Sequence, residues 1–283
     1  MKNILLIAAI LTSMVSLAAI SPTEKQALIK LHQATGGKNW TAKWDLNAPV
    51  EKWHGVRIEN DKVIAIDLPN NNLQGAIPQE IGNLTSLKKL NLFRNSLSGS
   101  IPASIANLKE LKSLNLSFNK LSGKIPGTIG QLRSLESLEL YMNRFSGPIP
   151  AKIGQLSNLQ TLSLFNNELE GELPQSLYGL KKLKVLLLSS NKISGKLSMD
   201  VANLSSLENL SLFENNLDGQ VPFDLEKLRN LKEMNISYNK FNGLVSRHLA
   251  QLDMLNMTMI NEQGVATALK VDLNRNSAIA ADE

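Results

Sequence analysis

The sequence predicts an α/β repeat solenoid, in which short strands and tight turns wind into a right-handed coil. Two observations predict this fold class. Residues 63–254 of the 283-residue chain divide into eight units of 24 residues with no insertion or deletion, and every unit has asparagine at its ninth position and glycine at its thirteenth. A fixed period of this length indicates stacked supersecondary units that share one continuous core.

Seven positions of each unit are always apolar, and the third unit illustrates them with Leu111, Leu114, Leu116, Leu121, Ile125, Ile129 and Leu132. The alternation of apolar and polar residues around positions 3 to 6 predicts a short strand whose side chains at positions 4 and 6 point into the coil. One unit buries too little apolar surface to offset the entropy of ordering its chain. The units must therefore stack to fold.

The invariant asparagine follows the strand, where the chain must bend and leave backbone groups inside the coil. Its amide offers donors and an acceptor, so we expect a column of asparagines that bond from one coil to the next. The members of this column are Asn71, Asn95, Asn119, Asn143, Asn167, Asn191, Asn215 and Asn239. Glycine at position 13 predicts a backbone geometry or a close approach that excludes a side chain. Proline at position 16 in six of the eight units stiffens the return path.

These units resemble the leucine-rich repeat family, and most of all its plant-type subclass, which reads L-x-x-L-x-L-x-x-N-x-L-x-G-x-I-P-x-x-I-G-x-L. Residues 87–110 and 135–158 are close copies of that pattern. The resemblance implies a curved solenoid with one parallel β-sheet on the concave face and short 3₁₀ or irregular segments on the convex face. The chain is similar to receptor ectodomains of plants and to secreted bacterial repeat proteins. This resemblance is more specific to fold than to function.

The sequence predicts four regions: a signal peptide over residues 1–19, an N-terminal cap over 20–62, the eight repeats over 63–254, and a C-terminal cap with a polar tail over 255–283. Lys2 precedes an apolar run from Ile4 to Ile20 that contains small residues, which is typical of a secretory signal. An uncleaved membrane anchor is the rival interpretation. We therefore expect a secreted, periplasmic or cell-surface protein.

The N-terminal cap is predicted to begin with a helix, because Ser21-Pro22-Thr23-Glu24 forms a capping box with proline at the first helical position. Two apolar segments, 56–58 and 63–66, flank a polar turn and predict a hairpin. Trp40, Trp44 and Trp53 are expected to cover the open end of the core. His54 is expected to pack within the cap.

After the repeats, Leu255, Met257, Met259 and Ile260 are expected to begin a ninth, incomplete coil, and residues 266–273 to add a short strand.

The composition argues against catalysis. Cysteine is absent, and the three histidines, His32, His54 and His248, are far apart in sequence. We therefore expect no enzymatic activity, no cofactor and no metal site. The net charge of +5 is dispersed among 25 acidic residues, which does not favour nucleic acid. No later segment is apolar enough to span a bilayer, so we expect no integral membrane association. We also expect a monomer.

The outward positions of the strands and of the bends after them are free to vary, so they are where a ligand would bind. Six aromatic residues line positions 7 and 8, and the sixth unit presents apolar residues beside two serines, which predicts a shallow notch. The predicted contact residues are Phe93, Arg94, Phe118, Tyr141, Phe165, Val185, Leu187, Phe213 and Tyr238. The alternative is that the aromatic rings form a stabilising spine, and that Val185 and Leu187 are scattered surface residues.

The functional hypothesis is recognition of a protein or peptide partner on the concave face. The alternative is binding of a carbohydrate or cell-wall component, including inhibition of wall-degrading enzymes. A hydrolase with an unrecognised site and a purely mechanical spacer are two further alternatives. Charged residues of both signs on the strands either set the register of a partner or keep the surface soluble.

Overall fold

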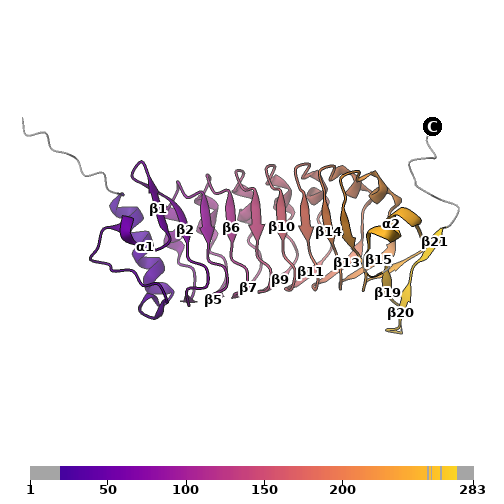
Figure 1. Ribbon diagram of the computed structural model, residues 1–283, viewed down its shortest axis with the longest axis horizontal. Coiled ribbons are helices and arrows are strands. Elements are labelled where there is room, and N and C mark those ends of the chain that lie inside the picture. The colour runs from indigo at the N-terminus through magenta and orange to yellow at the C-terminus, as the bar shows by residue number, and fades with distance from the viewer. Residues whose placement is uncertain (1–19, 254, 256, 262, 273–283) are drawn as a thin grey trace, which may run out of the picture.

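The computed structural model describes residues 20–253, 255, 257–261 and 263–272, and these form an elongated solenoid (Figure 1). The coils stack side by side along the long axis, from helix α1 (Pro22–Ala34) at one end to helix α2 (Arg247–Leu252) at the other. The predicted signal peptide and the polar tail after residue 272 lie outside the described residues. None of the helices in the described part of the chain has the length and apolar character that a bilayer crossing requires.

Nine strands form one sheet, here called the main sheet, which is parallel except for the first pair. Neighbouring repeat strands pair at a 24-residue offset, as in Leu90 with Leu114 and Leu114 with Leu138. In order, its strands are β1 (Val56–Glu59), β2 (Lys62–Asp67), β4 (Lys89–Asn91), β6 (Ser113–Asn115), β8 (Ser137–Glu139), β10 (Thr161–Ser163), β12 (Val185–Leu187), β14 (Asn209–Ser211) and β16 (Glu233–Asn235). This sheet confirms the predicted solenoid.

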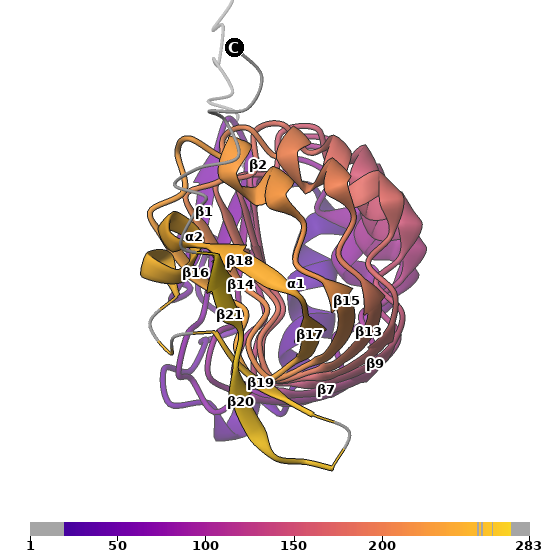
Figure 2. The same cartoon turned by 90° about the vertical axis from the view of Figure 1, so that its right-hand side faces the viewer.

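A second parallel sheet was not anticipated from the sequence. It consists of β3 (Gln74–Gly75), β5 (Ser96–Gly99), β7 (Lys120–Gly123), β9 (Arg144–Gly147), β11 (Glu168–Gly171), β13 (Lys192–Lys196), β15 (Asn216–Gln220) and β17 (Lys240–Asn242). The view along the solenoid axis in Figure 2 separates this sheet from strands β14 and β16 of the main sheet. It forms because coils stacked at strand spacing also bring the backbones after the bend into pairing distance.

Short 3₁₀ helices complete the coils: η3 (Gln79–Asn83), η4 (Ala103–Asn107), η5 (Gly127–Gln131), η6 (Ala151–Gln155), η7 (Gln175–Gly179), η8 (Met199–Asn203) and η9 (Phe223–Lys227). Six of these seven follow directly after the proline of position 16. In the sixth coil Ser198 replaces that proline, and its backbone N–H, which proline lacks, donates to the hydroxyl of Tyr178 in the preceding coil.

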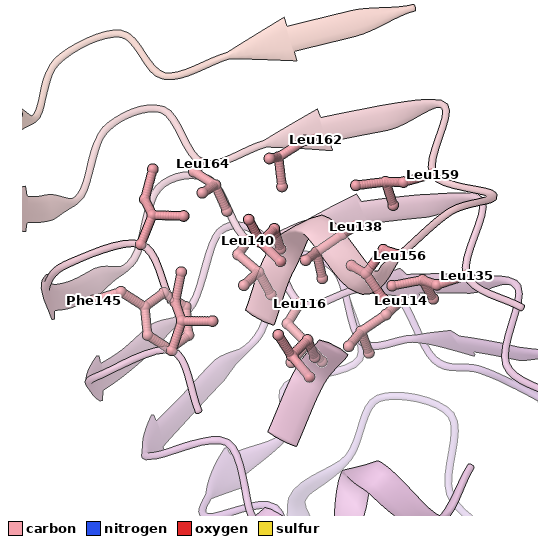
Figure 3. Close-up of a cluster of buried hydrophobic side chains, with 14 of the residues drawn as sticks. Leu114, Leu116, Leu135, Leu138, Leu140, Phe145, Leu156, Leu159, Leu162 and Leu164 are labelled. Atoms are coloured by element: carbon pink, nitrogen blue, oxygen red, sulfur yellow. The ribbon is translucent and has the colours of Figure 1, made fainter. Parts of the chain in front are cut away.

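The core is a continuous stack of aliphatic side chains. Leu114, Leu138 and Leu162 occupy equivalent positions in successive coils and are fully buried, as Figure 3 shows together with their neighbours at position 6. Each leucine therefore contributes to the core of its own coil and to that of the next.

The asparagine column lines the bends as predicted. The amide nitrogen of Asn119 lies within hydrogen-bond distance of the carbonyl oxygens of Leu92 in the preceding coil and Leu116 in its own coil, both at 3.0 Å. Its Oδ1 accepts from the backbone N–H of Leu97 at 2.9 Å. One side chain therefore satisfies buried backbone groups of two coils.

The N-terminal cap is joined to the first coil by Glu24. As predicted, the hydroxyl of Ser21 accepts from the backbone N–H of Glu24 at 3.2 Å and caps α1. The buried Glu24 carboxylate also accepts from the backbone N–H of Val63 at 3.2 Å. The predicted hairpin is strands β1 and β2, which turn at Asn60 and Asp61, both with positive φ.

The three tryptophans cover the end of the core, as expected, and two short 3₁₀ helices, η1 (Gly37–Asn39) and η2 (Val50–Lys52), position them. Trp44 stacks on Trp53, with ring centroids 4.8 Å apart, and it also faces the buried ring of His32 at 6.0 Å. The expectation that His54 packs within the cap is wrong, because its side chain is exposed. The cap uses the carbonyl of His54 instead, which accepts from Nε1 of Trp44 at 2.8 Å.

The C-terminal cap departs from the 24-residue spacing. That spacing would place residue 258 opposite Met234, but Met234 bridges to Asp253 instead, so the chain returns five residues early. The buried Asp253 carboxylate accepts from the backbone N–H of Ile236 at 2.8 Å and from the Ser237 hydroxyl at 3.0 Å.

The expected ninth coil therefore does not extend the main sheet as a further repeat strand. Instead β19 (Thr258–Ile260) pairs antiparallel with β20 (Ala266–Ala268), and β18 (Leu244–Ser246) pairs with β21 (Lys270–Asp272).

Replacing Asn119 with alanine is expected to lower the free energy of unfolding by about 3 kcal/mol, because it leaves buried backbone groups of two coils unpaired. Chemical denaturation followed by circular dichroism measures this loss. Asn107→Ala is the matched control, because Asn107 is exposed on η4, and it is expected to stay within about 0.5 kcal/mol of the parent. Equal stability of the two variants would contradict the proposed role of the column.

Acidification is expected to loosen the N-terminal cap. Burial lowers the pKa of His32 below its ordinary value of 6.5, so the unfolded state binds a proton more readily than the folded state does. The stabilisation is fully present above pH 6.5 and is lost as the pH falls through the lowered pKa. Thermal melting followed by tryptophan fluorescence at about pH 7.5 and about pH 5 measures this loss. His32→Phe is expected to reduce the dependence, and His54→Gln to retain it.

Candidate functional site

The predicted contact residues lie on the outer side of the main sheet and on the bend that follows each of its strands. Phe93, Tyr141, Phe165 and Phe213 are half-buried, whereas Phe118 and Tyr238 are 39% and 41% exposed. The structure brings these six rings together in two groups rather than in one stripe.

Four rings form a continuous cluster over coils 2 to 5, here called the four-ring cluster: Phe93, Phe118, Tyr141 and Phe165. Phe93 and Phe118 meet edge to face at 5.4 Å, and Phe118 meets Tyr141 in the same way at 5.7 Å. Tyr141 stacks on Phe165 at 4.4 Å with an interplanar angle of 10°. Burial raises the pKa of the Tyr141 hydroxyl, and the charge of Glu139 adds to the shift, so this hydroxyl remains protonated near neutral pH.

The other two rings, Phe213 and Tyr238, contact each other at 5.2 Å. Coil 6 separates them from the four-ring cluster, because it has serines at both ring positions. The Ser189 and Ser211 hydroxyls lie 2.6 Å apart, and the Ser190 hydroxyl donates to the Glu214 carboxylate at 2.6 Å. The gap between the two ring groups is therefore lined by small polar side chains.

Val185 and Leu187 occupy the same coil on strand β12, and both are half-buried. Leu187 pairs in register with Ser163 on one side and with Ser211 on the other. These small neighbours leave Leu187 accessible between the ring groups, and Val185 lies between Thr161 and Asn209. A separate hollow of about 370 Å³ lies at the bend of coils 5 to 7, and it is lined by Asn166, Asn167, Ser190, Asn191, Lys192 and Glu214.

Three lysines at the main sheet are paired with carboxylates of adjacent coils. Lys89 lies 2.6 Å from Asp67, and Lys112 lies 3.1 Å from Glu136. Lys232 lies 2.5 Å from Glu208 and, as a hydrogen-bond donor to it, lowers the pKa of the Glu208 carboxyl. These exposed pairs contribute little to stability, but they neutralise the charge of the sheet surface.

The backbone at position 8 fixes how this face is presented. All eight residues there have φ between 51° and 58°, in the left-handed region, although none is glycine: Asn70, Arg94, Phe118, Met142, Asn166, Ser190, Glu214 and Tyr238. This conformation directs successive backbone N–H groups to the next coil, as when Arg94 and Asn95 donate to the carbonyls of Ser117 and Phe118 at 2.9 and 3.1 Å. The sequence analysis did not predict this geometry.

The structure does not assemble a catalytic constellation from the histidines. His32 and His54 belong to the N-terminal cap, whereas His248 lies on α2 at the opposite end (Figure 1). Within the described ranges, no group of three or more acidic or histidine side chains is placed to hold a metal ion.

Comparison with known families identifies the repeat. A family model described as a leucine-rich repeat region matches residues 141–269, and the single leucine-rich repeat model matches residues 86–108 and 110–132. The chain is a leucine-rich repeat protein. The match of the first model extends past the eighth repeat into the C-terminal cap.

The similar proteins include plant receptors. The probable inactive receptor kinase RLK902 of Arabidopsis thaliana is 39% identical over 92 residues, which are 32% of this chain and 13% of that protein. The solved plant peptide hormone receptor RGFR1 in complex with RGF2 is 32% identical, with a TM-score of 0.65 over 73% of this chain and 32% of its own. A chain of the BIR3–SERK2 complex from Arabidopsis thaliana is also 32% identical, with a TM-score of 0.50 over 59% of this chain and 93% of its own.

This leucine-rich repeat chain spans only 13% and 10% of the curated relatives it matches. The similarity covers repeats, so it establishes the fold and its resemblance to receptor ectodomains.

A double-mutant cycle tests whether the four-ring cluster acts as a unit. Tyr141→Ala and Phe165→Ala are expected to show a coupling energy of about 1 kcal/mol in the free energy of unfolding, because their rings stack. Phe165→Ala with Phe213→Ala is the matched cycle, and its expected coupling is near zero because coil 6 separates the two rings. Coupling of equal size in both cycles would contradict the division into two groups.

Proposed function

We propose that this leucine-rich repeat protein is an exported, non-catalytic binding module that recognises a protein or peptide through the outer side of its main sheet and the bends beside it. The observation that carries the proposal is the arrangement of six aromatic side chains in two groups around an accessible apolar pair, Val185 and Leu187. Aromatic side chains expose a large contact area at low entropic cost and are enriched among residues that dominate binding energy.

The contact residues of this proposal are the nine that the sequence predicts: Phe93, Arg94, Phe118, Tyr141, Phe165, Val185, Leu187, Phe213 and Tyr238. Their backbone is fixed before binding, because every strand is paired with its neighbours and every bend is bonded to the next coil. A preformed surface loses little conformational entropy when a partner docks. At coil 6 the apolar side chains of Val185 and Leu187 suit contact with an apolar side chain of the partner, whereas the serines of the gap suit a polar one.

The similar proteins support a peptide or protein partner. RGFR1 was solved in complex with RGF2, a chain of the BIR3–SERK2 complex is among the similar structures, and the receptor kinase HAESA was solved with the peptide hormone IDA and the co-receptor SERK1. The apolar composition of residues 4–20 supports export. The ion pairs of lysines on the main sheet keep charged side chains on this face, which supports a soluble monomer.

Panning a displayed library of random peptides on the protein tests the proposal. The parent protein is expected to enrich a family of peptides. The combined variant Phe165→Ala, Val185→Ala, Leu187→Ala and Phe213→Ala is expected to bind them at least about thirtyfold more weakly, because about 2 kcal/mol or more of contact energy is removed. Thermal melting establishes that the variant is folded.

The matched control truncates four exposed apolar residues elsewhere on the surface, Met199, Leu244, Val265 and Val271. This variant is expected to bind the enriched peptides as the parent does. A glycan array run in parallel separates the carbohydrate alternative. Binding that survives the first variant would overturn the assignment of the site, and binding of glycans alone would overturn the assignment of the partner class.

A further inference from the structure

A cluster of four cations lies beside the four-ring cluster, and Lys192, Lys196 and Lys240 occupy the equivalent repeat positions in coils 6 and 8. We call it the basic flank: Arg94, Lys120, Lys124 and Arg144, all of which are exposed. Lys120 and Arg144 begin strands β7 and β9, which are neighbours in the second sheet. The stem of Lys124 lies over Gly147 of the next coil, so it reaches toward β9. The four charges therefore share coils 2 to 4.

The basic flank differs from the other cationic groups near the candidate site. On the main sheet, Lys89, Lys112 and Lys232 each contact a carboxylate of an adjacent coil. Among the residues that the structure describes, no carboxylate lies within 4.0 Å of any charged group of the basic flank. Its positive charge is therefore available to an external group.

The charge reverses at coil 5. Strand β11 carries Glu168 and Glu170, and Glu172 follows it, at the positions where coils 3 and 4 carry cations or uncharged residues. Lys192 of the following coil lies 3.6 Å from Glu168 and partly neutralises it. The surface of the bend thus has positive charge over coils 2 to 4, where the basic flank lies, and negative charge over coil 5.

The basic flank and the four-ring cluster cover the same stretch of the solenoid. Arg94 directly follows Phe93, and Lys120 follows Phe118 by two residues, so their Cα atoms lie within about 7 Å. Coils are spaced about 4.8 Å apart, and an extended peptide rises about 3.3 Å per residue, so roughly five residues span coils 2 to 5. A segment that lies along the solenoid axis between the rings and the flank would direct successive side chains to opposite sides, one set toward the rings and the other toward the flank.

We propose that the partner is an acidic, extended peptide segment, in which apolar side chains contact the four-ring cluster and carboxylates contact the basic flank. This inference rests on the proposed function and adds the charge of the ligand to it. The reversal at coil 5 predicts a basic or neutral residue in the partner where the segment reaches Phe165. Complementary charge of this kind fixes the register of the peptide on the protein and accelerates their association. The attraction weakens at high salt, because ions screen the charges.

The peptides enriched by panning provide the test. They are expected to have an excess of aspartate and glutamate, and binding of one such peptide, measured by fluorescence anisotropy, is expected to weaken about tenfold between about 50 and about 300 mM NaCl. The variant Arg94→Gln, Lys120→Gln, Lys124→Gln and Arg144→Gln is expected to bind at least about tenfold more weakly at low salt and to lose most of this salt dependence.

The matched control neutralises four exposed cations that share a single repeat position in the turn before the main-sheet strands: Lys109, Arg133, Lys181 and Arg229. Because it changes the net charge equally, it separates a local contact from a general electrostatic effect, and it is expected to bind as the parent does. Melting curves establish that both variants are folded.

Each result decides between the two proposals. Enriched peptides that lack acidic residues, or that bind the flank variant as well as the parent, would overturn the inference and leave the proposed function standing. The absence of any enriched peptide would overturn both. Binding of an acidic oligosaccharide without any peptide would also overturn both, since the flank would then serve a different class of ligand.

Discussion

The side-chain amide of each repeat asparagine from Asn95 to Asn239 joins two coils at once, and the rest of the solenoid depends on that bond. Each turn of the coil contains a bend, and the bend leaves carbonyl and N–H groups inside an apolar core. An unpaired polar group in that core lowers stability. Asn119 satisfies groups on Leu92, Leu116 and Leu97 with one side chain. Since coil spacing equals strand spacing, this bond and the two parallel sheets hold the same register.

The 24-residue period predicted the strands of the main sheet, because burial leaves a regular apolar pattern in the sequence. The 3₁₀ turns were implied by the resemblance to the leucine-rich repeat family, and the buried tryptophans by the need to cover the open end of the core. The second sheet was missed because it forms through the backbone, while its exposed side chains vary from Lys120 to Glu168. His54 was misplaced because a neighbour of a buried tryptophan need not itself be buried. The nine predicted contact residues were chosen from the repeat pattern, but the division of their rings at coil 6 depends on ring geometry that spacing does not encode.

At both ends of the solenoid a buried carboxylate pairs a backbone N–H group of the terminal coil, but the residue that supplies it differs. At the first coil a buried glutamate from α1 accepts a backbone N–H of β2, and at the last coil a buried aspartate accepts from the residue after β16. In both places a carboxylate accepts the N–H that a backbone carbonyl accepts in the interior coils, as when Leu87 donates to Leu84 and Leu92 to Asn115. The interior coils can therefore remain uniform in their buried residues.

The left-handed backbone at position 8 limits how this face can evolve. Eight side chains that stand beside the aromatic rings are attached to a conformation that β-branched residues adopt only with strain. Valine, isoleucine and threonine are therefore disfavoured in that column, whereas asparagine and glycine are tolerated there. A combinatorial redesign of the surface would have to allow fewer amino acid types at position 8 than at the strand positions. New specificities would therefore arise more readily from substitutions in the strands than from substitutions at the bend.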